Sequence, residues 1–191
     1  MPNWTENELT ITGPDVQKVL NAICSLNPLD EDMQVLDFDR IIPYPAQFKE
    51  LDLLNIEYQG KYHAIEMDDP QSQAKHESLA SEYGVEPGTP CLQDGYNSGG
   101  YEWCCDHWGT KWNATRPVLT LHQEPMKAFI EFDTAWSPPL PVIEKLAEMF
   151  PDHEFTLNYF EGGMGFCGQI QWGGGTETYH NQDDYNGPRG G

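Results

Sequence analysis

The stretch KAFIEFDTAWSPPLPVIEKLAEMF, residues 127–150, predicts a strand that leads directly into a helix. Apolar and polar side chains alternate through KAFIEFDTAW, residues 127–136, as they do in a strand with one buried face. Ser137 is a good N-cap, and Pro138 suits a first helical turn. Apolar residues then recur at helical spacing and form one stripe: Val142, Ile143, Leu146, Met149 and Phe150.

Further strands are predicted on both sides of this strand–helix unit. PVLTLHQEP, residues 117–125, precedes it with the same alternation. HEFTLNYFE, residues 153–161, and GFCGQIQW, residues 165–172, follow it and form a predicted hairpin across Gly162 and Gly163. The glycine-rich segment 176–191 has little to bury, so we expect it to be a flexible tail.

The N-terminal part predicts the other half of a sheet. NWTENELTITG, residues 3–13, alternates like a half-buried strand, and QVLDFDRIIPYP, residues 34–45, is also strand-like. Between them lies a predicted helix with an apolar stripe formed by Val16, Val19, Leu20, Ile23 and Leu26. The element order predicts an α+β protein with a ferredoxin-like antiparallel sheet (βαββαβ plus an extra C-terminal strand) and helices on one face. We expect one domain over residues 1–175, with a large acidic insertion at about 46–106.

The charge balance restricts the class of partner. The 191 residues include 31 acidic and 10 basic ones, which gives a net charge of −21. Direct binding of nucleic acid is not expected, because neutralising phosphates needs clustered Lys and Arg. Residues 50–106 alone hold twelve acidic and two basic residues. The alternatives are a solvated surface or contact with a basic partner protein through the acidic residues Asp68, Asp69, Glu77, Glu82 and Glu86.

Reactive side chains do not form a recognisable site in the sequence. Five cysteines at irregular spacing do not make a disulfide framework, so we expect reduced thiols. Cys104, Cys105 and His107 are close in sequence, but adjacent cysteines on an extended chain point to opposite faces, and we predict no metal site. We find no catalytic residues and no cofactor loop, and therefore predict a non-enzymatic protein without a cofactor. The N-terminus lacks signal-peptide features and no apolar run could span a membrane, which favours a cytoplasmic location.

Tryptophans gather around one lysine in and near the segment HWGTKWNA, residues 107–114. Such residues are often core. The alternative is an aromatic cleft in which a flat ligand stacks on the rings while Lys111 pairs with an anionic group. The residues of this candidate ligand site are Trp108, Lys111, Trp112 and Trp136.

Four motifs occur in an order that identifies a resemblance. They are MPNW.EN.LTITG at the N-terminus, HWGTKWNA at 107–114, F.TAWSPPLPVI from Phe132 to Ile143, and FP...F...YFE.G..F.G from Phe150 to Gly168. Together they resemble the YubB-type ferredoxin-like family of phage and plasmid proteins. The resemblance implies a ferredoxin-like fold and an origin on a mobile element in a bacterial host, and it implies no biochemical role. Members usually have cysteine where this chain has Thr5.

Two functional hypotheses follow from these patterns. The first is a non-enzymatic accessory protein that binds and inhibits a host macromolecule, such as a defence or DNA-binding protein, through an acidic face that imitates nucleic-acid phosphates. The alternative is a small-molecule or nucleotide-sequestering protein that uses the tryptophan and lysine cleft. The sequence does not indicate an oligomeric state.

Overall fold

The chain divides into two compact units in a computed structural model that describes residues 3–27, 30–66, 69–121 and 126–187. The first, called the sheet unit here, comprises Met1–Pro43 and Glu102–Gly191. The second, called the helical unit, is Tyr44–Tyr101. None of the helices in the described ranges is long and apolar enough to cross a lipid bilayer.

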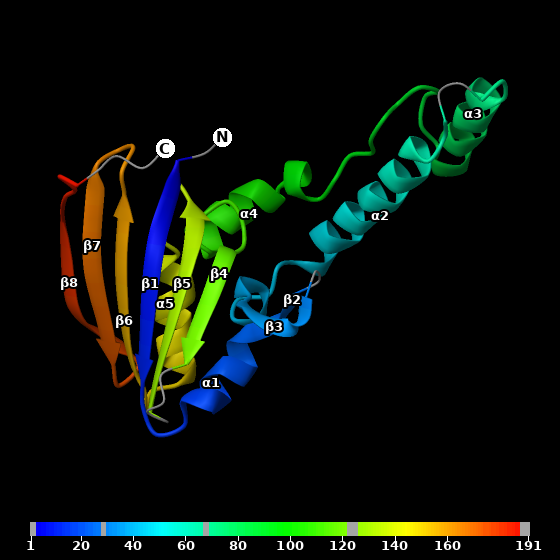
Figure 1. The fold of residues 1–191 in the computed structure, drawn as a ribbon. Helices are drawn as coiled ribbons and strands as arrows, with labels where there is room; N and C mark the ends of the chain where they lie inside the picture. Colours follow the sequence, from blue (N-terminus) through cyan, green and yellow to red (C-terminus); the bar gives the residue numbers. More distant parts are fainter. Residues whose placement is uncertain (1–2, 28–29, 67–68, 122–125, 188–191) are drawn as a thin grey trace. The chain divides into compact units, whose positions relative to one another are not determined.

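A six-stranded antiparallel sheet forms the sheet unit, with the strand order β4-β5-β1-β6-β7-β8 (Figure 1). The chain order β1, α1, β4, β5, α5, β6 together with the sheet order β4-β5-β1-β6 is the βαββαβ topology. The predicted α+β fold with a ferredoxin-like antiparallel sheet is therefore confirmed. The strands are β1 (Trp4–Thr12), β4 (Thr115–Leu121), β5 (Lys127–Ala135), β6 (Glu154–Glu161), β7 (Phe166–Gly173) and β8 (Thr176–Asp184).

Strand β8 corrects the prediction of a flexible tail over residues 176–191 for Thr176–Asp184, while residues 188–191 lie outside the described part of the chain. Thr176–Asp184 pairs antiparallel with β7 along its whole length, although all nine of its side chains are exposed. The prediction assumed that a segment with few apolar side chains to bury would not form an ordered strand. Here the backbone hydrogen bonds to β7 make the strand, and they do not require apolar residues.

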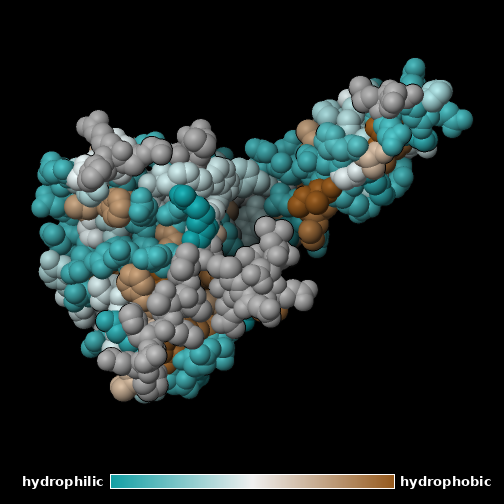
Figure 2. Space-filling model, in the orientation of Figure 1, coloured by the Kyte–Doolittle hydropathy of each residue, from teal (hydrophilic) through white to brown (hydrophobic). Residues whose placement is uncertain are grey.

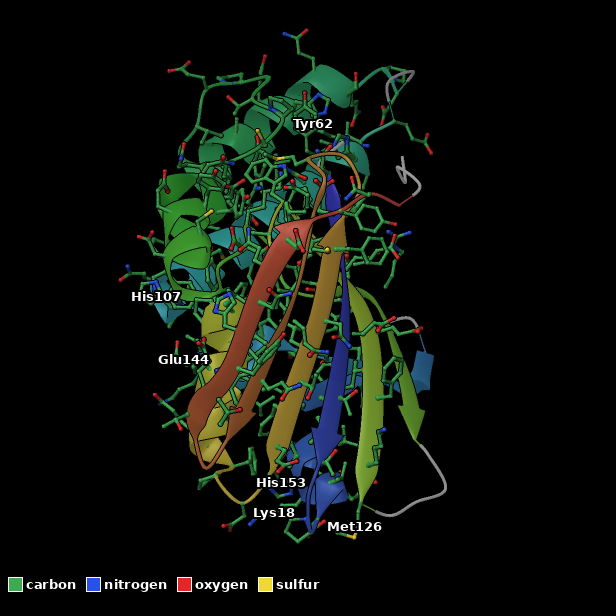
Figure 3. All side chains as sticks on the ribbon, turned by 90° about the vertical axis from the view of Figure 1, so that its left-hand side faces the viewer. Lys18, Tyr62, His107, Met126, Glu144 and His153 are labelled. Carbon is green, nitrogen blue, oxygen red and sulfur yellow. The ribbon has the colours of Figure 1, made fainter. Side chains whose placement is uncertain are left out.

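One face of the sheet is buried and the other is open. In β1 the buried side chains are Thr5, Asn7, Leu9 and Ile11, and β5 and β6 alternate in the same way. Helix α5 (Leu140–Met149) lies against β6, β7 and β8, and the apolar side chains of α1 (Val16–Ile23) are buried. Leu26 of the predicted stripe lies beyond the end of this helix and is 61% exposed. At one end of the sheet, Gly13 donates its backbone N–H to Met126 and leaves room for the His153 ring (Figure 3).

Two predicted elements differ from the structure. Residues 34–45 do not add a strand to the main sheet, because β3 (Asp30–Leu36) pairs with β2 (Cys24–Asn27) in a separate hairpin and the 3₁₀ helix η1 (Phe38–Arg40) follows. Ser137 does not cap α5, which begins at Leu140 after Pro139. The Ser137 hydroxyl instead donates to the Gly109 carbonyl at 2.5 Å, so a tertiary contact replaces the local cap.

The helical unit contains α2 (Ala46–His63), α3 (Ser72–Tyr83) and the 3₁₀ helix η2 (Tyr96–Ser98), and α4 (Gly100–His107) begins at its end. Tyr58 is buried between the helices, where its hydroxyl donates to the Thr89 carbonyl at 2.6 Å and its ring packs edge-on against Tyr83. Helix α2 also exposes apolar side chains, which appear as a hydrophobic area in Figure 2: Leu51, Leu53, Leu54 and Ile56.

Candidate functional site

The segment 107–114 is first of all a structural connector. Trp108 is only 5% exposed, and its indole N–H donates to the Ile42 carbonyl at 2.9 Å. The Asn113 side chain accepts the Phe38 backbone N–H at 2.8 Å and donates to Asp37. Trp108 therefore belongs to the core, and the structure separates its role from that of the other three predicted ligand residues.

The same segment is locked to the loop that follows β5. The Thr110 hydroxyl donates to the Ala135 carbonyl at 2.9 Å, and Ser137 donates to Gly109 from the other side. Gly109 has a φ of +75°, and a Cβ at this position would lie 2.8 Å from the Cδ atom of Pro141. Glycine is required there by both conformation and space. The motif at residues 107–114 and the motif from Phe132 to Ile143 are therefore in direct contact.

Lys111 fills the space between two tryptophan rings. Its ammonium nitrogen lies 3.9 Å from the ring centroid of Trp112 and 3.9 Å from that of Trp136. Both rings are partly exposed, at 37% and 43%. The structure brings these three predicted residues together, but a flat ligand would have to displace the lysine in order to stack between the rings.

Two residues that were not in the predicted site extend this group. The Trp4 ring lies 6.0 Å from that of Trp112, and the Arg116 guanidinium lies 5.8 Å from the Trp4 ring. Cations and aromatic rings therefore alternate along a cation–aromatic row formed by Trp136, Lys111, Trp112, Trp4 and Arg116. Trp4 lies on the same face of β1 as Glu6 and Glu8, which is the open face. Its neighbours in the row are more than 100 residues away in sequence.

Acidic side chains face each other across the open face of the sheet beside this row. The strand register places Glu6 directly opposite Asp133 and Glu8 directly opposite Glu131. Arg116 forms an ion pair with Asp133, yet burial raises the pKa of the Asp133 carboxyl more strongly than the guanidinium lowers it. We call this region the acidic hollow. It has a volume of about 340 Å³ and is lined by Glu6, Asn7, Glu8, Arg116, Glu131, Phe132, Asp133 and Phe160.

The acidic residues predicted for partner binding lie in the helical unit and are partly neutralised there. Asp69 pairs with Lys75, and Glu82 lies 2.9 Å from the Lys61 ammonium. Glu77 and Glu86 are exposed, and Asp68 lies outside the described residues. The helical unit has ten acidic and three basic residues, about a third of the acidic residues in about a third of the chain. Negative charge is therefore spread over both units.

The cysteines and the histidine of this region lie on a helix, which corrects the assumption of an extended chain. Cys104 is buried in α4, and the His107 ring stacks on Trp103 with 4.5 Å between ring centroids. The His107 Nδ1 atom lies 2.9 Å from the Trp103 carbonyl oxygen. Within the described ranges, no three His, Cys, Asp or Glu side chains come close enough together to hold a metal ion.

Comparison with known proteins supports the ferredoxin-like assignment. Residues 107–187 match the family model described as "Ferredoxin-like domain in Api92-like protein", and this match includes β8. A crystal structure of the protein api92 from Yersinia pseudotuberculosis superposes with a TM-score of 0.50 at 13% identity, and covers 98% of this chain and 99% of that one. No curated protein matches the sequence. The chain is thus similar to Api92-like proteins through its ferredoxin-like domain, which holds all of the cation–aromatic row except Trp4.

Proposed function

We propose that this protein is a non-enzymatic binding protein whose acidic hollow takes up a cationic segment of a partner protein. The observation that carries the proposal is the register of β1 and β5, which places two pairs of acidic side chains directly opposite each other. Like charges in this arrangement destabilise a sheet, by roughly 0.2–1 kcal/mol for each pair. A cationic ligand would turn that repulsion into attraction.

The surroundings of the hollow favour a Lys or Arg side chain as the group that is bound. Within the described ranges Arg116 forms an ion pair with Asp133 and none with Glu8 or Glu131. The rings of Trp4 and Trp112 stand at the edge of the same face and already contact cationic groups of this chain. Carboxylates together with aromatic faces attract guanidinium and ammonium groups by charge and by cation–π interaction.

The identity of the partner is proposed from charge and from the resemblance stated above. A net charge of −21 suits a partner with a basic surface, such as a DNA-binding or defence protein of a bacterial host. In this proposal the protein comes from a phage or plasmid, acts in the host cytoplasm, and occupies the surface that would otherwise bind phosphates. Association should then weaken as salt rises, because exposed charges are screened.

The test neutralises one acidic pair without changing its shape. The double variant Glu8→Gln/Glu131→Gln should unfold at a temperature about 1–4 °C higher than the original protein, because a repulsive pair of up to about 1 kcal/mol is removed. It should also lose binding to an arginine- and lysine-rich peptide, measured by calorimetry at low salt, and should no longer retain basic proteins from a bacterial lysate. Glu144→Gln is the matched control, because Glu144 is exposed on α5 and faces away from the hollow (Figure 3).

The result has a clear contrary outcome. If the double variant and the control bind the peptide and retain lysate proteins equally well, the hollow is not the binding surface. A double variant that is less stable than the original protein would show instead that these carboxylates support the fold.

A further inference from the structure

We propose that the helix-covered side of the sheet holds a second site, a cavity that binds a small, neutral, planar aromatic molecule carrying a hydrogen-bond acceptor. The cavity has a volume of about 520 Å³, within the range of small-molecule sites. It lies between the loop that leads into α5 and the ends of β6, β7 and β8. Its aromatic and polar lining includes Trp136, Ser137, Tyr159, Met164, Phe166 and Gln182.

Tyr159 supplies a hydrogen-bond donor to this cavity. Tyr159 is only 4% exposed, and its hydroxyl, which is not completely closed off from solvent, makes no hydrogen bond within the described part of the chain. A Cβ at Gly168, which faces Tyr159 in the sheet, would lie 2.3 Å from that hydroxyl. Glycine at this position therefore leaves the space that the tyrosine occupies, and Gln182 pairs with the same glycine from β8.

Buried polar groups without partners are uncommon in folded proteins, and each one calls for an explanation. Asn7 lies opposite Tyr159 in the register of β1 and β6, and its Oδ1 atom is completely buried and has no hydrogen-bond partner among the described residues. Burial raises the pKa of the Tyr159 hydroxyl, so it remains a protonated donor at neutral pH. A ligand that accepts this proton in a hydrogen bond satisfies the tyrosine.

Among the described residues, the cavity walls offer no cationic group that would bind an anion, and this restricts the class of ligand. The N-terminus of α5 offers no free donor to an anion: Leu140 donates to Pro138, Val142 and Ile143 both donate to Pro139, and Pro141 has no N–H. Lys111 lies over the Trp136 ring and does not line the cavity. Apart from Tyr159, Ser137 and Gln182, the lining is aromatic and apolar, and aromatic side chains pack well against flat rings. A neutral aromatic molecule therefore fits better than a nucleotide phosphate.

The backbone conformation of Trp136 supports the assignment of a binding site here. Its φ of +73° is rare for a bulky residue. The Trp136 backbone N–H donates to the Asn3 carbonyl at 2.9 Å, and the hydroxyl of the next residue, Ser137, donates to the Gly109 carbonyl. Residues persist in such strained conformations only where the surrounding structure holds them, and they cluster at functional sites. Here the residue with this rare conformation is part of the cavity lining.

The experiment uses benzamide and nicotinamide as probes and toluene as an apolar comparison, each titrated into the full chain and followed by protein-observed NMR. Benzamide and nicotinamide should bind more tightly than toluene and should shift the backbone N–H signals of Tyr159, Phe166 and Gln182. Tyr159→Phe removes only the hydroxyl and should weaken amide binding about fivefold, the worth of one hydrogen bond, without affecting toluene. Tyr179→Phe, an exposed tyrosine on the open face of β8, is the matched control and should change nothing.

Two results would overturn the proposal. One is that no probe shifts these signals at millimolar concentration while circular dichroism shows a folded protein. The other is that Tyr159→Phe binds the amides as tightly as the original protein does. The site is independent of the acidic hollow, so Glu8→Gln/Glu131→Gln should leave amide binding unchanged.

Discussion

The same substitution at two tryptophans of one motif should have very different effects on stability. Trp108 and Trp112 are four residues apart, but the first is 5% exposed and the second is 37% exposed. We expect Trp108→Phe to destabilise the sheet unit strongly and Trp112→Phe to destabilise it only slightly. The contrast tests whether the connector is core on one side and surface on the other.

The magnitudes follow from the contacts. Trp108→Phe leaves the Ile42 carbonyl without its donor, which costs about 1–3 kcal/mol, and the smaller ring adds a cavity cost of about 1 kcal/mol. Trp112→Phe keeps an aromatic face for Lys111 and loses about 0.5 kcal/mol of cation–π interaction. For a chain of this size, 1 kcal/mol corresponds to about 2–4 °C in the unfolding temperature. We therefore expect decreases of about 4–16 °C for Trp108→Phe and about 1–2 °C for Trp112→Phe.

Thermal unfolding followed by far-UV circular dichroism measures both variants under the same conditions. Urea unfolding of each variant gives the free energies independently. Equal decreases for the two variants would refute the division of the motif into core and surface, and so would a decrease below about 2 °C for Trp108→Phe.

Two further predictions test local conformation and burial. Gly109→Ala should lower the free energy of unfolding by about 2–4 kcal/mol in urea titrations, because the left-handed backbone and the Pro141 side chain both oppose a Cβ. Gly174 has a similar φ, but a Cβ there would have nothing within 4 Å. Gly174→Ala should therefore lower the free energy of unfolding by only about 1–2 kcal/mol. Equal costs would contradict the steric argument. Burial raises the pKa of the Cys24 thiol from 9.0 to about 11, so the folded state keeps this proton after the unfolded chain has lost it, and the stabilisation present below pH 9 should decline as the pH rises towards 11. Cys24→Ala should show a smaller decline in the same urea titrations, and an identical pH profile would be the contrary result.

Much of the fold could be predicted because it depends on local periodicity. The alternation of residues 127–136 and the apolar stripe that begins at Val142 describe which face of each element is buried, whatever it packs against. The hairpin between β6 and β7 also follows from a short glycine-containing turn. Sequence motifs likewise drew attention to Lys111, Trp112 and Trp136, which the fold does bring together.

The tertiary structure decided the features that depend on pairing between distant segments. Strand β8 exists because β7 offers it a hydrogen-bonding edge, and the acidic hollow exists because β1 and β5 pair in a register that opposes Glu8 to Glu131. The contact of Trp4 with Trp112 and the position of the Tyr159 hydroxyl over Gly168 have the same origin. By itself the sequence determined which side chains lie on each face of an element, because that periodicity is a property of the local backbone. Which faces meet was decided by strand order and register, because these are set by hydrogen bonds and packing over the whole chain.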